Sequence, residues 1–238
     1  MATDIRSASR WILLPGTLCT ADVFAPLMQA LDRADEEHIV VPLDMPDISS
    51  YRKRLSQTVR KGDIVCGFSL GAIAVAHAAD LLRDARALIL IALNPRPDVA
   101  EKRPGREALR DAVYSDELAA ALEAAAPTLF ANPTSGLCAQ IIDMAQQEAR
   151  HIEAQTALAL HRPGALSALR NCPAPVVFVT GEQDRQTPAE LAHEAARATP
   201  RAALKIVPGL GHFGLLENPA VVAKAVCKGL EELGVIKC

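Results

Sequence analysis

This sequence of 238 residues has few aromatic side chains, no large excess of charge and no long apolar run. Aromatic residues make up 3% of the chain and the formal net charge is −3, which excludes an obvious stacking platform or basic face for nucleic acid or an anionic membrane. The apolar run that begins at Trp11 ends at Pro15, too early for the hydrophobic part of a signal peptide or for a membrane span. We therefore expect a cytoplasmic protein with neither nucleic acid nor membrane as a partner.

Paired cysteine motifs are absent as well. The six cysteines include no C-x-x-C pair, and none lies at a zinc-finger spacing from a histidine. A chain of this length buries about three-quarters of the surface that its unfolded form exposes, so it does not need disulfides. We expect reduced thiols. Cys238, the last residue, is the one thiol for which we consider an interchain disulfide, and we assign no function to it.

Short apolar runs alternate with segments of helical spacing along most of the chain. Gly, Pro, Asp or Asn ends each run, as is typical of strands that are buried on both faces. The runs cover residues 11–14, 38–43, 63–66, 87–93, 176–180 and 204–207, and the helical segments include 21–33, 69–82, 189–199 and 219–233. This alternation predicts an α/β protein with a predominantly parallel, doubly wound sheet of about six strands.

Residues 98–164 depart from this alternation, because they contain helical patterns and no convincing strand. The expected helices are 107–114, 116–125, 136–148 and 151–160. Ser115 or Asp116 is expected to cap the second helix, and Pro127 and Asn132-Pro133 are expected to interrupt the segment after it. We expect a helical cap over the sheet edge at which open α/β sheets bind ligands. The chain then divides into core residues 1–97, a cap at 98–164 and core residues 165–238.

The motif Gly67-Phe68-Ser69-Leu70-Gly71 lies between an expected strand and an expected helix. A serine on so abrupt a turn needs strained backbone angles, and the glycines on either side remove Cβ atoms that would collide. Such a turn lifts the Ser69 hydroxyl above the sheet edge, where it can act as a nucleophile. In the alternative interpretation, Ser69 only caps the helix.

A serine hydroxyl needs an adjacent base to react at neutral pH. Among the six histidines, His212 is the best placed, in a glycine-rich loop directly after the run 204–207. The acid that orients this base is expected just beyond the preceding strand, where Asp184 lies, with Glu182 and Asp98 as alternatives. Each of the three residues follows an expected parallel strand, so all three are expected at one edge of the sheet. Their order along the chain is Ser, Asp, His.

Acyl transfer also requires hydrogen-bond donors for the developing oxyanion. The backbone N–H of Leu70, in the first turn of the helix after Ser69, is one candidate. The second is expected after the first strand, where Gly16 permits a tight turn; Thr17 N–H is the natural donor and Leu18 N–H the next choice. A simple Pro-Gly turn is the alternative.

With these motifs the sequence resembles the α/β-hydrolase superfamily, particularly its small carboxylesterase-like members with a helical cap. The resemblance covers residues 11–233 and is strongest at 67–71, 179–184 and 208–213, with Glu217-Asn218-Pro219 following. It implies an α/β-hydrolase fold with Ser69 as nucleophile, His212 as base, Asp184 as orienting acid and the Thr17 and Leu70 amides as oxyanion hole. Two features depart from the family pattern: Pro15 replaces the usual histidine, and the chain begins at the family's third strand, so two edge strands are expected to be missing.

These residues allow three hypotheses about function. The first is a serine hydrolase that cleaves a small-molecule carboxylic ester through an acyl-enzyme, without a metal or cofactor. The second keeps the same three residues and cleaves a C–C bond or a thioester. The third is a non-catalytic protein of the same fold that binds a small ligand. Arginines in or beside the expected cap either meet an acidic substrate or form a solvated helix face; they are Arg103, Arg106, Arg110, Arg150 and Arg162.

Overall fold

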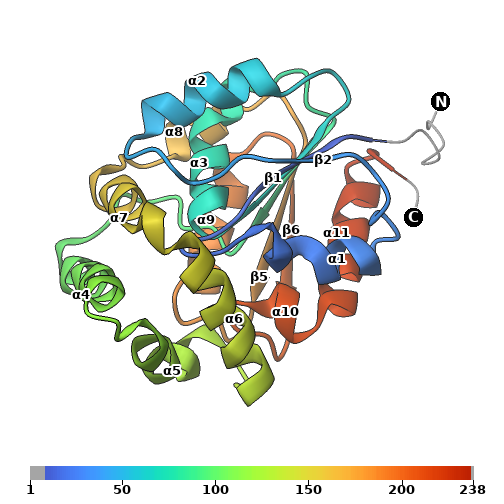
Figure 1. Ribbon diagram of the computed structural model, residues 1–238. Coiled ribbons are helices and arrows are strands. Elements are labelled where there is room, and N and C mark those ends of the chain that lie inside the picture. The colour runs from blue at the N-terminus through green and yellow to red at the C-terminus, as the bar shows by residue number, and fades with distance from the viewer. Residues whose placement is uncertain (1–8, 237–238) are drawn as a thin grey trace.

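A computed structural model describes residues 9–236 of the protein, so Cys238 lies outside the described residues (Figure 1). Within that range, six parallel strands form one sheet in the order β2-β1-β3-β4-β5-β6. The strands are β1 (Trp11–Leu14), β2 (His38–Val40), β3 (Ile64–Phe68), β4 (Ala87–Ile91), β5 (Val176–Gly181) and β6 (Ala202–Val207). The prediction of a parallel α/β sheet of about six strands is confirmed.

Helices cover both faces of this sheet (Figure 1). One face carries α1 (Ala25–Ala30) and α11 (Pro219–Glu232), and the other carries α2 (Ile48–Thr58), α3 (Leu70–Ala78), α8 (Leu166–Arg170) and α9 (Ala189–Ala198). The apolar pattern does not predict α2, because Tyr51 and Leu55 are its only buried residues. The short 3-10 helix η1 (Ala21–Phe24) precedes α1, and the short helix α10 (Gly214–Glu217) precedes α11.

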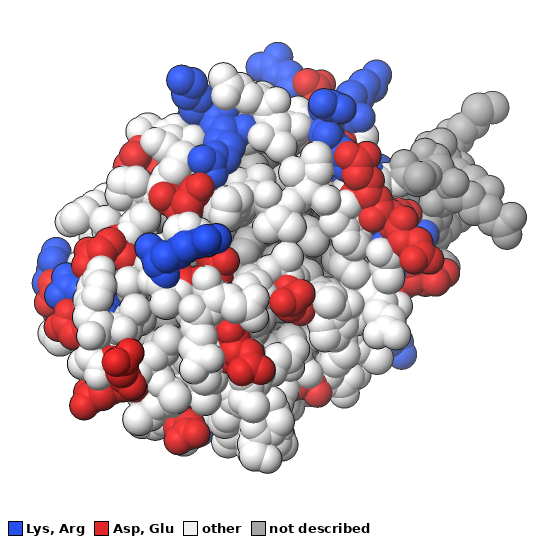
Figure 2. Space-filling view, viewed as in Figure 1, with Lys and Arg blue, Asp and Glu red and all other residues white. Residues whose placement is uncertain are grey.

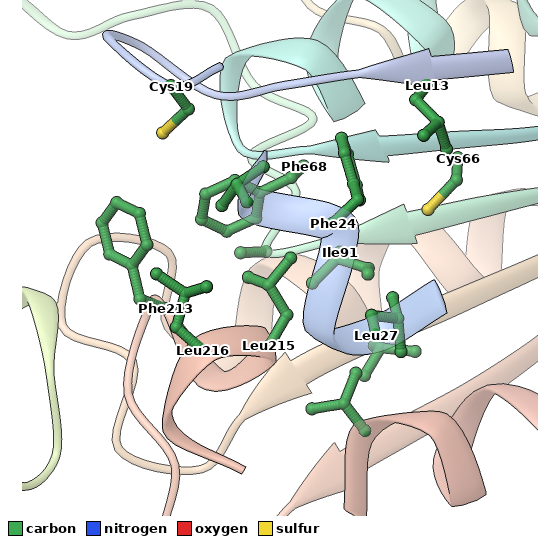
Figure 3. Close-up of a cluster of buried hydrophobic side chains, with 14 of the residues drawn as sticks. Leu13, Cys19, Phe24, Leu27, Cys66, Phe68, Ile91, Phe213, Leu215 and Leu216 are labelled. Carbon is green, nitrogen blue, oxygen red and sulfur yellow. The ribbon is translucent and has the colours of Figure 1, made fainter. Parts of the chain in front are cut away.

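The core consists of two apolar layers, one on each face of the sheet. The central strands β3 and β4 are buried along their whole length, which explains why they appear in the sequence as uninterrupted apolar runs. Figure 3 shows the layer beneath η1 and α1, where side chains of these helices meet those of β1, β3, β4 and the segment around α10. Phe68 lies in this layer and its ring packs edge-on against that of Phe213, with 5.1 Å between the ring centroids.

Four longer helices lie between β4 and β5 in the chain, although these two strands are direct neighbours in the sheet. The helices are α4 (Arg103–Tyr114), α5 (Leu118–Leu129), α6 (Ser135–Glu148) and α7 (Ile152–His161), and they lie together at one end of the molecule (Figure 1). We refer to them as the cap helices. The boundaries of a cap at 98–164 stay a prediction. No helix within residues 9–236 is long and apolar enough to cross a membrane.

The expected start of α5 and the expected interruption at Pro127 are wrong, whereas Asn132-Pro133 does lie in the gap between α5 and α6. The helix begins after Glu117, and no side chain caps it. Asp116 has a φ of 58°, and the Ser115 hydroxyl donates to the carbonyl of Asp111 in the preceding helix instead. Pro127 lies inside α5, in its exposed last turn, where water can satisfy the carbonyl that the missing N–H leaves without a partner.

Charges of both signs are scattered over the face shown in Figure 2, with uncharged surface between them. Lys and Arg side chains lie beside Asp and Glu at the edges of this view. On this face, the described residues form no continuous basic surface of the kind that a nucleic acid requires.

Candidate active site

The candidate site lies where the strand order of the sheet reverses. Strands β1 and β3 are neighbours in the sheet. After β1 the chain passes to β2 on one side, and after β3 it passes to β4 on the other side, so the two loops that leave these strands diverge from each other. Ligands of open α/β sheets bind at such a point, beyond the carboxyl ends of the strands. The loop after β1 contains Thr17, and the turn after β3 contains Ser69.

Ser69 occupies a strained turn between β3 and α3. Its φ of 51° and ψ of −115° are unfavourable for a residue with a Cβ atom, and such a conformation costs about 1–3 kcal/mol. The flanking glycines make the turn feasible. A Cβ on Gly67 would lie 2.6 Å from the Cα of Ala72, and a Cβ on Gly71 would lie 2.1 Å from the carbonyl oxygen of Leu14. Ser69 makes no side-chain hydrogen bond that caps α3, contrary to the alternative interpretation.

The structure brings Ser69, His212 and Asp184 together in one chain of hydrogen bonds. His212 Nε2 lies 2.9 Å from Ser69 Oγ, and His212 Nδ1 lies 2.9 Å from Asp184 Oδ2. Asp184 and His212 are both buried. With its proton on Nδ1, the imidazole donates to the Asp184 carboxylate and presents a lone pair on Nε2 to the Ser69 hydroxyl. This arrangement allows proton transfer from the serine.

Asp184 is held as a carboxylate by a set of donors. The Thr187 hydroxyl donates to Oδ2 at 2.6 Å, and the backbone N–H groups of Gln186 and Thr187 donate to Oδ1, each at 2.8 Å. Burial alone would raise the pKa of Asp184, but the interaction with His212 and the hydrogen bonds from Thr187 outweigh it, so the pKa lies below its usual value. The carboxylate is therefore ionised at neutral pH and can stabilise an imidazolium.

The two alternative acids lie elsewhere. The side chain of Asp98 is buried and pairs with the guanidinium groups of Arg106 and Arg162. Glu182 is exposed at the end of β5. Within the described residues, Asp184 is the only carboxylate whose oxygen lies within hydrogen-bond distance of His212.

The loop after β1 distinguishes between the two expected donors. Leu18 has a φ of 53°, and its N–H donates at 2.8 Å to the side-chain oxygen of Gln155, a buried residue of α7. The N–H of Leu18 is therefore occupied. The N–H of Thr17 makes no hydrogen bond within the described part of the chain. Leu70 is the first residue of α3, so its N–H has no acceptor within the helix.

The loop that carries His212 is attached to the cap by Glu217. One carboxylate oxygen of Glu217 accepts from Gly211 N–H at 2.8 Å, and the other accepts from Ala131 N–H at 2.8 Å and Asn132 N–H at 3.3 Å. A single carboxylate thus fixes the histidine loop against the segment between α5 and α6.

Sequence reasoning assigned no role to three residues that position these groups: Thr187, Gln155 and Glu217. Thr187 has a local signal, because a threonine three residues after Asp184 is typical of a turn closed by an aspartate side chain. Glu217 lies in the Glu217-Asn218-Pro219 segment that contributes to the family resemblance and bonds Gly211 six residues away, but its contact with the cap has no local signal. Gln155 has no local signal. Gln155 acts on Leu18 across 137 residues, and Glu217 reaches Ala131 across 86 residues.

A cavity of about 510 Å³ opens beside Ser69 and His212. The core supplies Thr17, Phe68 and Phe213, among others. The cap helices supply mainly apolar side chains: Leu109, Ala121, Leu122, Ala125, Leu129, Ile141 and Ala145. A mainly apolar cavity with a few polar groups is typical of a small-molecule site. Within residues 9–236, no group of three or more His, Cys, Asp or Glu side chains is arranged to hold a metal ion. The described cysteines Cys19, Cys66, Cys138, Cys172 and Cys227 are free thiols.

Comparisons with known proteins agree with this architecture. Pimeloyl-(acyl-carrier protein) methyl ester esterases of Xanthomonas campestris pv. campestris and Xanthomonas oryzae pv. oryzae are 26% and 25% identical, over 90% of this chain and 92% of each relative. An esterase from Thermogutta terrifontis has a TM-score of 0.77 at 20% identity, covering 95% of this chain and 90% of that one. MenH from S. aureus has a TM-score of 0.80 at 14% identity, covering 98% and 97%. These two likenesses show the fold.

A model of the alpha/beta hydrolase family matches residues 11–225. This range begins at the first residue of β1 and extends into α11, so it includes every described strand of the sheet and both loops that carry Ser69 and His212. The chain therefore belongs to the alpha/beta hydrolase family.

Proposed function

We propose that this protein is a serine hydrolase that cleaves a small-molecule carboxylic ester, with Ser69 as nucleophile, His212 as base and Asp184 as orienting acid. The observation that carries the proposal is the unbroken chain of hydrogen bonds from Ser69 Oγ through His212 to Asp184 Oδ2, beside a cavity of small-molecule size. The names of the Xanthomonas relatives, which are methyl ester esterases, support an ester as the bond that is cleaved.

The geometry suits a two-step acyl transfer. Ser69 Oγ attacks the ester carbonyl while His212 Nε2 takes the hydroxyl proton, and the imidazolium is stabilised by the Asp184 carboxylate. The tetrahedral intermediate collapses as His212 gives the proton to the leaving alcohol, which leaves an acyl group on Ser69. Water then attacks this ester, its proton passes through His212 to Ser69, and the carboxylic acid is released.

The Thr17 and Leu70 N–H groups are the proposed donors to the oxyanion. Both residues line the cavity beside Ser69, and neither N–H is occupied by the fold in the way that Leu18 N–H is. Each such donor contributes about a hundredfold to a thousandfold in kcat when it is correctly placed.

Covalent labelling tests the proposal directly. A fluorophosphonate reacts with an activated serine, so intact mass and peptide mapping should find one adduct on Ser69. We expect no adduct in Ser69→Ala and slow labelling in His212→Ala. Hydrolysis of simple methyl and p-nitrophenyl esters should fall about 10⁴-fold or more in Ser69→Ala, with unchanged thermal unfolding.

Other outcomes separate the remaining hypotheses. Retention of more than a few per cent of the activity in Ser69→Ala would refute the nucleophile. Labelling without ester turnover, but with turnover of acyl thioesters or of β-diketones, would favour the thioester or C–C bond hydrolase. Absence of both labelling and turnover would favour a ligand-binding protein of the same fold.

A further inference from the structure

Charged residues from the segment between β4 and β5, which contains the cap helices, line the same cavity as Ser69 and His212. They are Glu101, Lys102, Arg106 and Arg162, the last of which comes directly after α7. Most of the remaining lining contributed by the cap helices is apolar, so these groups make a polar area in an otherwise apolar chamber. None of them belongs to the hydrogen-bond chain of Ser69, His212 and Asp184.

Arg162 has an unusual position for a charged residue, because it is only 3% exposed. Its Nη1 donates to the carbonyl of Ala159, and its Nη2 donates to Asp98 Oδ1 at 3.3 Å. Its Nε is buried and has no hydrogen-bond partner among the described residues. A buried guanidinium N–H without a partner costs free energy, so an acceptor brought to this position would stabilise Arg162.

The neighbouring cations have spare donors as well. Arg106 uses Nε and Nη2 on Asp98, which leaves Nη1 without a hydrogen-bond partner in the described range, and Lys102 Nζ donates only to the carbonyl of Gln186, at 3.1 Å. Partial desolvation of the ammonium group beside the cavity, and then the nearby Arg106 charge, lower the pKa of Lys102.

The charge balance of this cluster favours a single negative charge on the ligand. Lys102, Arg106 and Arg162 supply three positive charges, while Asp98 and Glu101 supply two negative charges. The excess of one positive charge matches a carboxylate. A phosphate dianion would leave an unpaired negative charge in a largely apolar chamber, which is costly.

We propose that this cluster is a subsite for a carboxylate of the substrate, so that the enzyme prefers esters that carry a second, free carboxylate. Monoesters of short dicarboxylic acids are the simplest compounds of this class. The proposal rests on the proposed function, since it assigns the substrate class of the same cavity. Arg162 and Lys102 are then binding residues that make no contact with Ser69 and serve the acid end of the acyl chain.

The test compares charged and neutral esters of the same acids. Wild-type kcat/KM is measured for monomethyl succinate, glutarate and adipate and for the corresponding dimethyl esters. We expect kcat/KM to be at least tenfold higher for one of the monoesters than for its dimethyl ester. The difference should arise from a lower KM for the monoester. Equal or better turnover of all the dimethyl esters would overturn the subsite. Failure to hydrolyse any ester would instead count against the proposed function.

Variants locate the effect. Lys102→Gln and Arg162→Gln should each reduce kcat/KM for the preferred monoester about tenfold, equivalent to ~1.4 kcal/mol, and leave the dimethyl ester within threefold of wild type. Arg103→Gln is the matched control, since Arg103 is exposed on α4 and does not line the cavity. Equal losses for both kinds of ester would overturn the proposal. Should Arg162→Gln fail to fold, Lys102→Gln decides, because Lys102 is exposed.

Calorimetry on Ser69→Ala protein makes the test independent of turnover. We expect glutarate or adipate to bind, and inorganic phosphate to bind at least tenfold more weakly. Adding Lys102→Gln to the Ser69→Ala protein should reduce the affinity for the dicarboxylate. Tighter binding of phosphate would overturn the assignment to a carboxylate. Absence of binding of every anion would overturn the subsite altogether.

Discussion

Gln155 offers a test of how the cap helices support catalysis. It is buried in α7, and its side-chain oxygen accepts the Leu18 N–H at 2.8 Å. That bond fixes Leu18 at a φ of 53°, a conformation that is unfavourable outside glycine. Leu18 comes directly after Thr17, the proposed oxyanion donor. We therefore expect Gln155 to be a positioning residue, which acts on the reaction through the backbone of this loop.

Gln155→Met keeps the length of the side chain and removes the acceptor. The buried Leu18 N–H then lacks a partner, which costs about 1–3 kcal/mol and favours rearrangement of the loop. Complete loss of one oxyanion donor would reduce kcat about 10²–10³-fold. Because Thr17 is displaced and not removed, we expect a smaller loss, about 10-fold to 100-fold in kcat, with KM within threefold of wild type.

Steady-state kinetics on a neutral p-nitrophenyl ester, together with thermal unfolding, measure both effects. Thr156→Val is the matched control, because Thr156 is buried in the same helix and makes no hydrogen bond to the loop. An unchanged kcat in folded Gln155→Met would refute the reasoning. So would an equal loss of kcat in Thr156→Val, since the effect would then reflect general damage to α7.

Three further substitutions probe other parts of the structure. Gly71→Ala places a Cβ 2.1 Å from a carbonyl oxygen of β1, so Tm should fall by about 5–10 °C or more, and an unchanged Tm in a calorimetric scan would contradict the close approach. Thr187→Val removes a donor to the Asp184 carboxylate and should lower kcat about tenfold with little change in KM; a change confined to KM would argue against this role. Burial lowers the pKa of His77, so the unfolded chain binds protons first as the pH falls below about 6.5, and wild type should lose stability relative to His77→Gln between pH 7 and pH 5. Urea unfolding across this range measures the difference, which would stay constant if the pKa of His77 were unshifted.

The strands whose burial is complete were the easiest parts of the fold to predict. The strands β3, β4 and β5 are buried on both faces, so their apolar runs stand out in the sequence. Helix α2 was not predictable, because it buries only Tyr51 and Leu55 and is otherwise polar. The start of α5 was mistaken because Ser115 bonds backwards to the preceding helix, an outcome that depends on how α4 ends.

The candidate site shows the same division between local and distant contacts. The position of Ser69 was predictable because a strained turn demands glycines at fixed offsets. His212 and Asp184 could be placed because both come after strands and so reach the same sheet edge. The occupation of Leu18 N–H by Gln155 could not be foreseen, since no local pattern joins residues 137 positions apart.

The direct pairing of β4 with β5 has a consequence for how such a protein diversifies. The chain leaves the sheet after one strand and returns in its immediate neighbour, so the segment between them can change length or sequence without altering the register of the sheet. Ser69, Asp184 and His212 all lie outside that segment, whereas Lys102, Arg106 and Arg162 all lie within it. Selection can therefore replace the groups proposed to choose a substrate while the groups proposed to break its bond are inherited unchanged.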